Sequence, residues 1–134
     1  MSLIKLIEFN VLGDERGQLM VLETMKNIPF EMKRVYYLTG TKPEIPRGFH
    51  AHKELLQVAV CVSGKCLMVM DNGVKKENVW LDSPNKAIFI DKMIWHEMHH
   101  FSADCVLLVV ASELYDENDY IRSYADFVGM IHHG

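Results

Sequence analysis

The sequence predicts an all-β protein: a jelly-roll β-barrel with a short C-terminal helix, in one domain that spans residues 1–134. Short runs rich in β-branched and aromatic residues recur along most of the chain and are separated by turn residues. No helical pattern lies between these runs, which excludes the crossover helices that a parallel sheet needs. Only the last stretch, from Tyr120 to Ile131, repeats its apolar residues at helical spacing.

In the first half of the chain, the patterns predict strands at residues 3–12, 18–22 and 33–38. Residues 40–46 contain two prolines and a glycine and are predicted to form a loop. The run at 3–12 is apolar on both of its strand faces, so it needs cover on both. Either its own barrel or a partner subunit could supply that cover.

In the second half, strands are predicted at residues 58–62, 66–70, 79–81, 87–90 and 106–110. The sequence Asp71-Asn72-Gly73 predicts a hairpin with a type I′ turn, because Asn-Gly tolerates positive φ. Asn118 or Asp119 is a candidate cap for the terminal helix. The short strands and single helix predict a barrel, whose mouth is a natural ligand pocket.

The composition excludes several classes of function. The formal net charge is −4, which gives no electrostatic footprint for nucleic acid. No apolar run reaches the ~18 residues of a membrane span, and the N-terminus lacks a signal-peptide pattern. The three cysteines have no tight spacing, which argues against a secreted disulfide framework and favours buried, inert thiols. A soluble, cytoplasmic protein is predicted.

Three histidines are the candidate functional residues. His50 and His52 are one residue apart, so they share a face if they lie on a strand. His96 lies on a separate strand-like segment and could join them in the fold. Neutral imidazole is both the commonest metal ligand and the commonest proton shuttle at physiological pH. The pattern therefore predicts a metal site or an acid–base site, although a hydrogen-bonded structural role is open for each histidine taken alone.

A metal site is one interpretation. Metal-binding cupin barrels use His-x-His, a Glu a few residues later and a His from a later strand. Here Gln57 stands where that pattern has its Glu, and an amide is a weaker ligand for divalent ions than a carboxylate. A second metal interpretation is a zinc peptidase, since His96, Glu97 and His100 match His-Glu-x-x-His. That motif requires a helix, and the flanking sequence is β-rich.

The other interpretation is acid–base catalysis without a metal. A neutral histidine in a partly apolar pocket can move a proton in either direction. Two histidines on one strand face suit an enolisation beside a carbonyl. Arg47, three residues before His50, is placed to bind an anionic group, because guanidinium binds phosphate in a bidentate manner.

Several blocks of the sequence resemble one family, the nucleotide-sugar 3,4-ketoisomerases, which are metal-free cupins acting on dTDP-4-keto-6-deoxy-glucose. The resemblance runs from about Phe9 to Phe127. Its most specific part is the Arg-Gly-x-His-Ala-His pattern at residues 47–52 followed by Gln57. The remaining blocks are Arg34-Val35-Tyr36-Tyr37, Trp95-His96-Glu97-Met98 and the stretch from Tyr115 to Arg122.

The resemblance implies an isomerase that needs no cofactor and no metal. It would convert dTDP-4-keto-6-deoxy-D-glucose into the 3-keto sugar through an enediol, for the 3-amino-3,6-dideoxyhexoses of surface glycans. It implies His52 as the main base and His50 as its partner, with Tyr37 near the reacting oxygens. Adjacent tyrosines on a strand alternate in direction, so only one of the pair should face the pocket. Substrate-binding roles are implied for Arg47, Arg16, Arg34, Tyr36, Gln57 and His96.

The resemblance also implies a homodimer with exchanged N-terminal strands. Two alternatives stay open: a metal-dependent cupin enzyme, either an oxygenase or an isomerase, and a non-catalytic cupin that binds a sugar nucleotide. The configuration at C4 of the product depends on the geometry of the pocket, which motifs do not encode.

Overall fold

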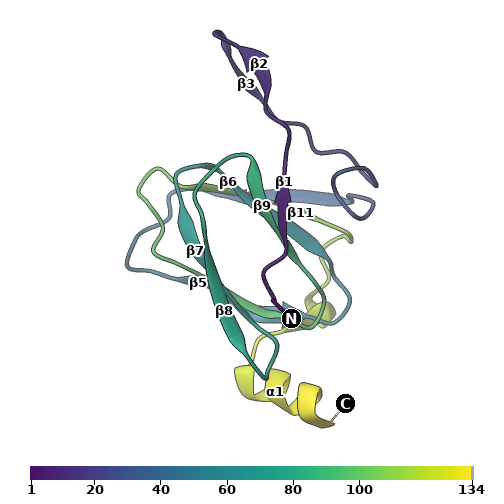
Figure 1. Ribbon diagram of the computed structural model, residues 1–134. Coiled ribbons are helices and arrows are strands. Elements are labelled where there is room, and N and C mark those ends of the chain that lie inside the picture. Colours follow the sequence, from purple (N-terminus) through teal and green to yellow (C-terminus); the bar gives the residue numbers. More distant parts are fainter. Residues whose placement is uncertain (134) are drawn as a thin grey trace.

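Two five-stranded antiparallel sheets face each other in the computed structural model, which describes residues 1–133 (Figure 1). The first sheet contains, in spatial order, β1 (Leu6–Glu8), β9 (Lys86–Ile90), β6 (Gln57–Ser63), β11 (Val106–Ala111) and β4 (Arg34–Leu38). The second contains β12 (Tyr120–Ile121), β5 (Arg47–His52), β10 (Trp95–His99), β7 (Cys66–Asp71) and β8 (Lys76–Leu81). The predicted all-β jelly roll with a short C-terminal helix is confirmed.

The main core lies between the two sheets. Alternation along each strand sends every second side chain inward, so Ala59 and Cys61 of β6 meet Met68 of β7 in one buried cluster. β6 is buried on both faces over Gln57–Cys61 because a second cluster covers its outer side. Phe9, Ile28 and Phe30 form that cover. This double cover explains why β6 is a continuous apolar run in the sequence.

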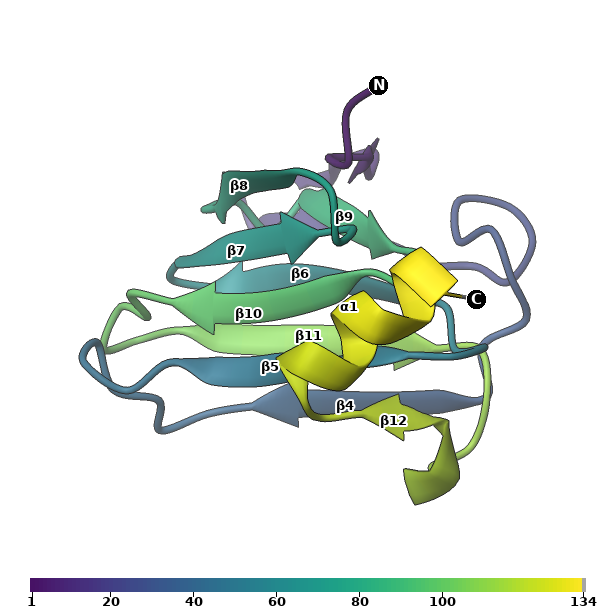
Figure 2. The same cartoon turned by 90° about the horizontal axis from the view of Figure 1, so that it is seen from below.

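The C-terminal helix α1 (Tyr124–His133) crosses the outer face of the second sheet (Figure 2). Phe127 is fully buried there against Trp95, Ala51 and Ile121. The amide of Asp126 donates a hydrogen bond to the Ser123 hydroxyl (3.2 Å), so Ser123 caps the helix. Within residues 1–133, no helix is both long and apolar enough to cross a membrane.

A separate two-stranded hairpin extends from the barrel, formed by β2 (Leu12–Asp14) and β3 (Gly17–Leu19) (Figure 1). The preceding strand, β1, pairs with β9 of the same chain at one edge of the first sheet. The hairpin leaves Leu12 and Leu19 exposed, at 50% and 57% of their surface.

Three local predictions were wrong. The strand predicted at residues 3–12 is divided between β1 and β2. The predicted cap residues Asn118 and Asp119 instead belong to a 3₁₀ turn, η1 (Glu117–Asp119), and the stretch expected to begin the helix forms β12. The hairpin at Asp71-Asn72-Gly73 exists, but its turn is not the predicted type I′. Four residues connect β7 and β8, and only Gly73 of the Asn-Gly pair has a positive φ. The side chain of Asn72 accepts hydrogen bonds from Val74 and Lys75 and shapes this wider loop.

Candidate active site

The three predicted histidines meet inside the barrel. His50 and His52 point inward from β5, and His96 is paired with His50 in the neighbouring strand β10. The ring centroid of His50 lies 4.7 Å from that of His96 and 5.1 Å from that of His52. Because β10 is a strand, the helix that a His-Glu-x-x-His peptidase site requires does not form at residues 95–99.

The Nδ1 atom of each histidine faces a hydrogen-bond acceptor. His50 Nδ1 lies 3.1 Å from the carbonyl of Gly48, and His96 Nδ1 lies 3.0 Å from the carbonyl of Ile94. His52 Nδ1 lies 3.2 Å from Oδ2 of Asp119. A carbonyl or carboxylate oxygen only accepts hydrogen bonds, so these contacts assign the hydrogen to Nδ1 and leave the lone pair on Nε2. Among the described residues, the buried Nε2 of His52 has no hydrogen-bond partner.

The three rings are neutral at physiological pH. Burial, followed by repulsion from His52, lowers the pKa of His50 to about 4. Burial, followed by repulsion from His50, lowers the pKa of His96 to about 3. Burial and His96 also lower the pKa of His52, while the carboxylate of Asp119 opposes that shift. A neutral imidazole with a free Nε2 lone pair is ready to accept a proton.

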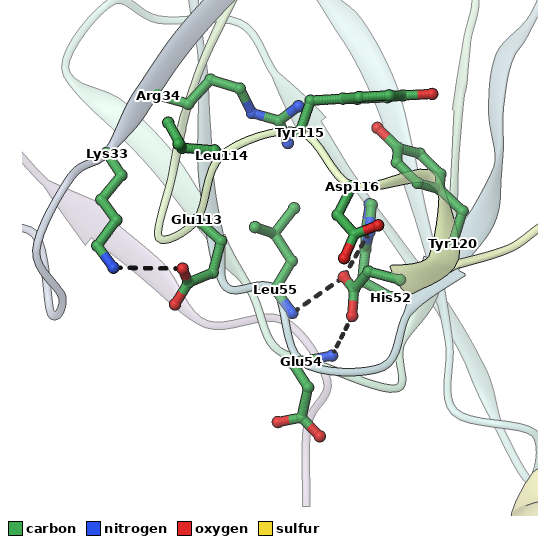
Figure 3. A pocket seen from close by; sticks show the side chains of 11 residues that line it. Lys33, Arg34, His52, Glu54, Leu55, Glu113, Leu114, Tyr115, Asp116 and Tyr120 are labelled. Atoms are coloured by element: carbon green, nitrogen blue, oxygen red, sulfur yellow. Dashed lines mark hydrogen bonds and ion pairs between the residues drawn. The ribbon is translucent and has the colours of Figure 1, made fainter.

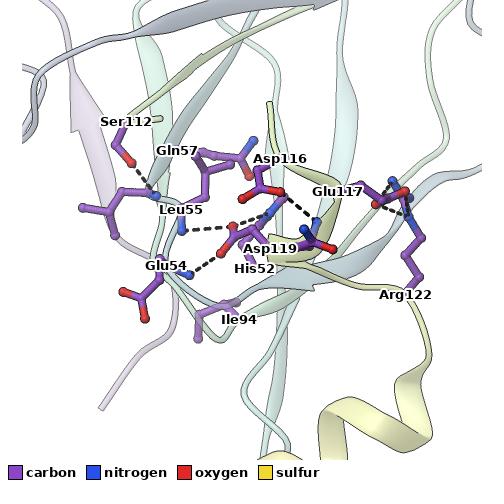
Figure 4. Close-up of polar contacts among 12 residues, drawn as sticks. His52, Glu54, Leu55, Gln57, Ile94, Ser112, Asp116, Glu117, Asp119 and Arg122 are labelled. Atoms are coloured by element: carbon purple, nitrogen blue, oxygen red, sulfur yellow. Dashed lines mark hydrogen bonds and ion pairs between the residues drawn. The ribbon is translucent and has the colours of Figure 1, made fainter. Parts of the chain in front are cut away.

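Asp119 is held tightly beside His52 (Figure 4). Its Oδ1 accepts a hydrogen bond from the backbone amide of Glu54 (2.8 Å) and its Oδ2 accepts one from the amide of Leu55 (3.3 Å). These bonds hold the carboxyl group in place, where its contact with Nδ1 fixes both the orientation and the tautomer of the His52 ring. In the sequence, Asp119 is recognisable only as a candidate helix cap, and its contact with His52 is not apparent. Its one signal was membership of the block from Tyr115 to Arg122.

A cavity of about 660 Å³ opens beside the histidines. His50, His96, Gln57 and Tyr36 line it. The Gln57 side chain donates a hydrogen bond to the hydroxyl of Tyr36 (2.7 Å), and burial raises the pKa of Tyr36 to about 12. Tyr37 lies on the opposite face of β4 and is 66% exposed. The expectation that Tyr37 faces the pocket is therefore wrong, because strand alternation places Tyr36 there.

The predicted arginines lie in different places. Arg47 and Arg34 line the cavity, as does Arg122, which the sequence analysis did not assign. The guanidinium carbon of Arg122 lies 4.2 Å from the ring centroid of Tyr120, and its side chain pairs with Glu117. Arg16 lies on the exposed β2–β3 hairpin, paired with Asp14, and does not line the cavity of its own chain.

A second cavity of about 520 Å³ shares Arg34 and Tyr120 with the lining of the first (Figure 3). His52 and Asp119 line this cavity, whereas His50 lines the larger one. The ring of Tyr120 borders both spaces and lies 4.3 Å from the ring of His52, centroid to centroid. Tyr120 and Arg34 therefore lie where the two cavities adjoin, a position for Tyr120 that was not predicted from the sequence.

The histidine cluster has the spacing of a metal site. The ligand atoms of His50, His52 and His96 lie within 4.8 Å of one another. Three neutral imidazoles and the amide of Gln57 would carry no negative charge to offset a divalent cation. The ligand number and spacing therefore suit a metal such as zinc, while the neutral charge of the set weakens its affinity.

The fold and the site together define a cupin-type barrel protein in which three neutral histidines meet, one of them oriented by a half-buried carboxylate. The chain belongs to the WxcM-like, C-terminal family (FdtA), whose model matches residues 2–132.

Similarity to characterised proteins is high. A TDP-4-oxo-6-deoxy-alpha-D-glucose-3,4-oxoisomerase of Aneurinibacillus thermoaerophilus is 52% identical over 123 residues, which are 92% of this chain and 88% of the relative. A 3,4-ketoisomerase of Helicobacter canadensis is 45% identical, with a TM-score of 0.95 over 98% of this chain and 99% of its own. A histidine-to-asparagine mutant of the Thermoanaerobacterium thermosaccharolyticum 3,4-ketoisomerase, in complex with TDP-4-keto-6-deoxyglucose, is 38% identical, with a TM-score of 0.93. That match covers 96% of this chain and 93% of the mutant.

Proposed function

We propose that this protein is a sugar-nucleotide 3,4-ketoisomerase that converts dTDP-4-keto-6-deoxy-D-glucose into the dTDP-3-keto-6-deoxyhexose. The meeting of three neutral imidazoles beside the two cavities carries the proposal from the structure, since the reaction consists only of proton transfers. The 52% identical oxoisomerase supplies the substrate class. The 3-keto product would then serve the synthesis of 3-amino-3,6-dideoxyhexoses.

The reaction needs two proton movements. The carbonyl at C4 acidifies the proton on C3, and its removal, with protonation of O4, gives an enediol. Transfer of a proton to C4 and loss of the proton from O3 then produce the 3-ketone. One group can therefore serve the carbon atoms while another serves the oxygen atoms.

The two cavities suggest how the histidines divide this work. His50 lines the larger cavity, whereas His52 is 2% exposed and borders the smaller one. We assign His50 to the proton that moves from C3 to C4, and His52 with Asp119 to the proton that moves between O3 and O4. This order reverses the assignment made from the family resemblance, in which His52 is the main base. Tyr36 would hydrogen-bond the reacting oxygens, in place of Tyr37.

The diphosphate requires positive charge at the entrance of the larger cavity. Arg47 is exposed there and makes no ion pair among the described residues, so it is free to bind phosphate oxygens. Arg34 stacks over Tyr36, with its guanidinium carbon 5.3 Å from the ring centroid. Its Nε atom is buried and has no hydrogen-bond partner within residues 1–133, so Arg34 has donor capacity for a ligand.

The test is NMR of dTDP-4-keto-6-deoxy-glucose incubated in deuterated water with enzyme treated with a chelator. We expect a 3-keto sugar with deuterium at C4, whose ring couplings give the C4 configuration. His50→Asn should abolish deuterium exchange at C3, while His52→Asn should retain partial exchange and lose net isomerisation. Unchanged substrate, with activity restored by added metal, would favour the metal-dependent alternative. Tight binding of dTDP without any reaction would favour a binding module.

We further propose that the chain is a homodimer with exchanged N-terminal strands. The extended β2–β3 hairpin exposes Leu12 and Leu19, and a second copy is the surface that would bury them. In such an arrangement the hairpin would bring Arg16 toward the partner's cavity. Light scattering should give twice the chain mass, and Leu19→Glu should shift it toward the monomer. A wild-type monomer at assay concentration would refute the proposal.

The cytoplasmic location stays a prediction.

A further inference from the structure

Three cysteines meet inside the barrel, away from the histidines. Cys61 points inward from β6, Cys66 is the first residue of β7, and Cys105 immediately precedes β11. Cys61 lies four residues beyond Gln57, roughly 13 Å along the strand. A layer of apolar side chains that line the catalytic cavity belongs to the same core cluster as the cysteines: Ala59, Met68 and Leu107.

The sulfur atoms are close enough to share one ligand. The Sγ of Cys61 lies 3.7 Å from the Sγ of Cys66 and 3.7 Å from that of Cys105, and all three lie within 4.8 Å of one another. Each residue is at most 2% exposed. In the described part of the chain, the group contains sulfur ligands only, with no histidine or carboxylate. The sequence analysis expected buried thiols but did not bring them together.

Cys61 and Cys105 are protonated thiols. The hydrogen bond with Cys66, together with burial, raises the pKa of Cys61 far above its usual range. Burial raises the pKa of Cys105 to about 12. A ligand for this site must therefore remove the protons without leaving a net charge in an apolar interior, where an unpaired charge is costly.

We propose that Cys61, Cys66 and Cys105 form a three-sulfur binding site for a trivalent, thiophilic element that enters as a neutral hydroxide. Arsenic(III), in the form of arsenous acid, is the species that matches this description. Three S–H bonds and three As–O bonds break, three As–S bonds form, and three water molecules leave. The oxidation state of arsenic does not change, and the product is neutral. A zinc ion held by three thiolates would instead carry net negative charge and lack its fourth ligand.

The adduct would connect the two sheets. Cys61 and Cys105 belong to strands of the first sheet or their immediate flank, and Cys66 belongs to the second. One arsenic atom would therefore link β6, β7 and the start of β11 across the core. A ligand that binds the folded state in preference to the unfolded state raises its melting temperature. Because the thiols are buried, the rate of reaction should be limited by local opening and become independent of arsenite concentration.

The full-length protein incubated with sodium arsenite provides the test. Mass spectrometry should show a gain of one arsenic atom and a loss of three hydrogen atoms. Titration after unfolding in acid should show three fewer reactive thiols. X-ray absorption of the wild-type adduct should show three sulfur neighbours and no oxygen, a measurement that requires no variant.

Cys61→Ser removes the shared sulfur and should abolish the adduct, while His50→Asn, in the other cluster, should leave it unchanged. Circular dichroism would establish that each variant is folded. An unchanged mass in the wild type, oxygen neighbours on arsenic, or binding of cadmium(II) without binding of arsenite would each overturn the proposal. None of these readouts depends on isomerase activity, so their failure is distinguishable from failure of the proposed function.

Discussion

Replacing Asp119 with asparagine should slow the reaction while leaving the fold intact. In Asp119→Asn the amide can still accept one backbone hydrogen bond, but its NH2 group can face Nδ1 of His52. The imidazole would then carry its hydrogen on Nε2, the atom that must be free to accept a proton. A histidine whose orienting carboxylate becomes an amide loses about 10⁴ in kcat in a serine protease, for the same reason of tautomer.

The geometry sets the expected magnitude. Loss of one charge-assisted hydrogen bond costs about 1.5–3 kcal/mol, which is the lower limit. The attraction between a carboxylate and an imidazolium 3.2 Å apart is about 5 kcal/mol at an effective dielectric constant of 20, which is the upper limit. At 1.36 kcal/mol per tenfold change, kcat should fall between about ten-fold and several thousand-fold, with KM unchanged.

Asp116→Asn is the matched control. Asp116 lines the same cavity and caps η1 by accepting a hydrogen bond from the amide of Asn118 (3.0 Å), a contact that asparagine preserves. Both variants remove one negative charge, but only Asp119 contacts a histidine. Rates would be measured by NMR over a pH series, together with the melting temperature of each variant. If kcat of Asp119→Asn lies within threefold of that of Asp116→Asn, the positioning role is refuted.

Three further results are expected. Because the pKa of His50 is lowered to about 4, more than about 90% of its imidazole is neutral at pH 5.5, against about 10% for an ordinary histidine. We therefore expect kcat/KM at pH 5.5 to equal its value at neutral pH. A decrease in kcat/KM with an apparent pKa near 6.5 would contradict this. The pKa of His96 is about 3 in the folded state and about 6.5 in the unfolded state, so between these values the unfolded chain binds more protons than the folded one. The free energy of unfolding should therefore fall as the pH drops below about 6.5. In denaturant titrations, His96→Gln should reduce that slope by up to about 1.4 kcal/mol per pH unit, and an unchanged slope would exclude His96 as its source. Tyr36→Phe should lower kcat by about tenfold or more through loss of a hydroxyl in the cavity, whereas Tyr37→Phe should match wild type; equal effects in the isomerase assay would contradict the placement of the two rings.

The strands that could be predicted from sequence are those whose β-branched runs match their burial. Residues 58–61 of the predicted run are apolar because β6 is covered there on both faces, and that pattern is visible without a structure. The His-x-His spacing likewise predicts a shared face from geometry alone. The N-terminal region was harder, since residues 3–12 look alike in sequence but belong partly to the barrel edge and partly to a separate hairpin.

The orienting carboxylate could not be predicted, because it depends on an approach between segments far apart in the chain. Asp119 is 67 residues from His52, and locally it carries the same signal as a helix cap. The choice between Tyr36 and Tyr37 also depends on tertiary structure. Alternation requires that the two rings point to opposite faces of β4, but it does not say which face turns toward the core between the sheets. The packing of Tyr36 against that core decides it.

The segment that carries Asp119 has a consequence for how the enzyme fails. η1 and the two-residue β12 lie at the edge of the second sheet. β12 is joined to β5 there through two residue pairs, Tyr120 with His52 and Ile121 with Ala51. Such a short peripheral strand opens with less free energy than the doubly covered β6. Hydrogen exchange should therefore report release of the amides of Glu54 and Leu55 before the barrel melts. Heat inactivation would then precede global unfolding. The highest temperature at which the enzyme works is therefore set by the stability of the β12–β5 pairing rather than by that of the core.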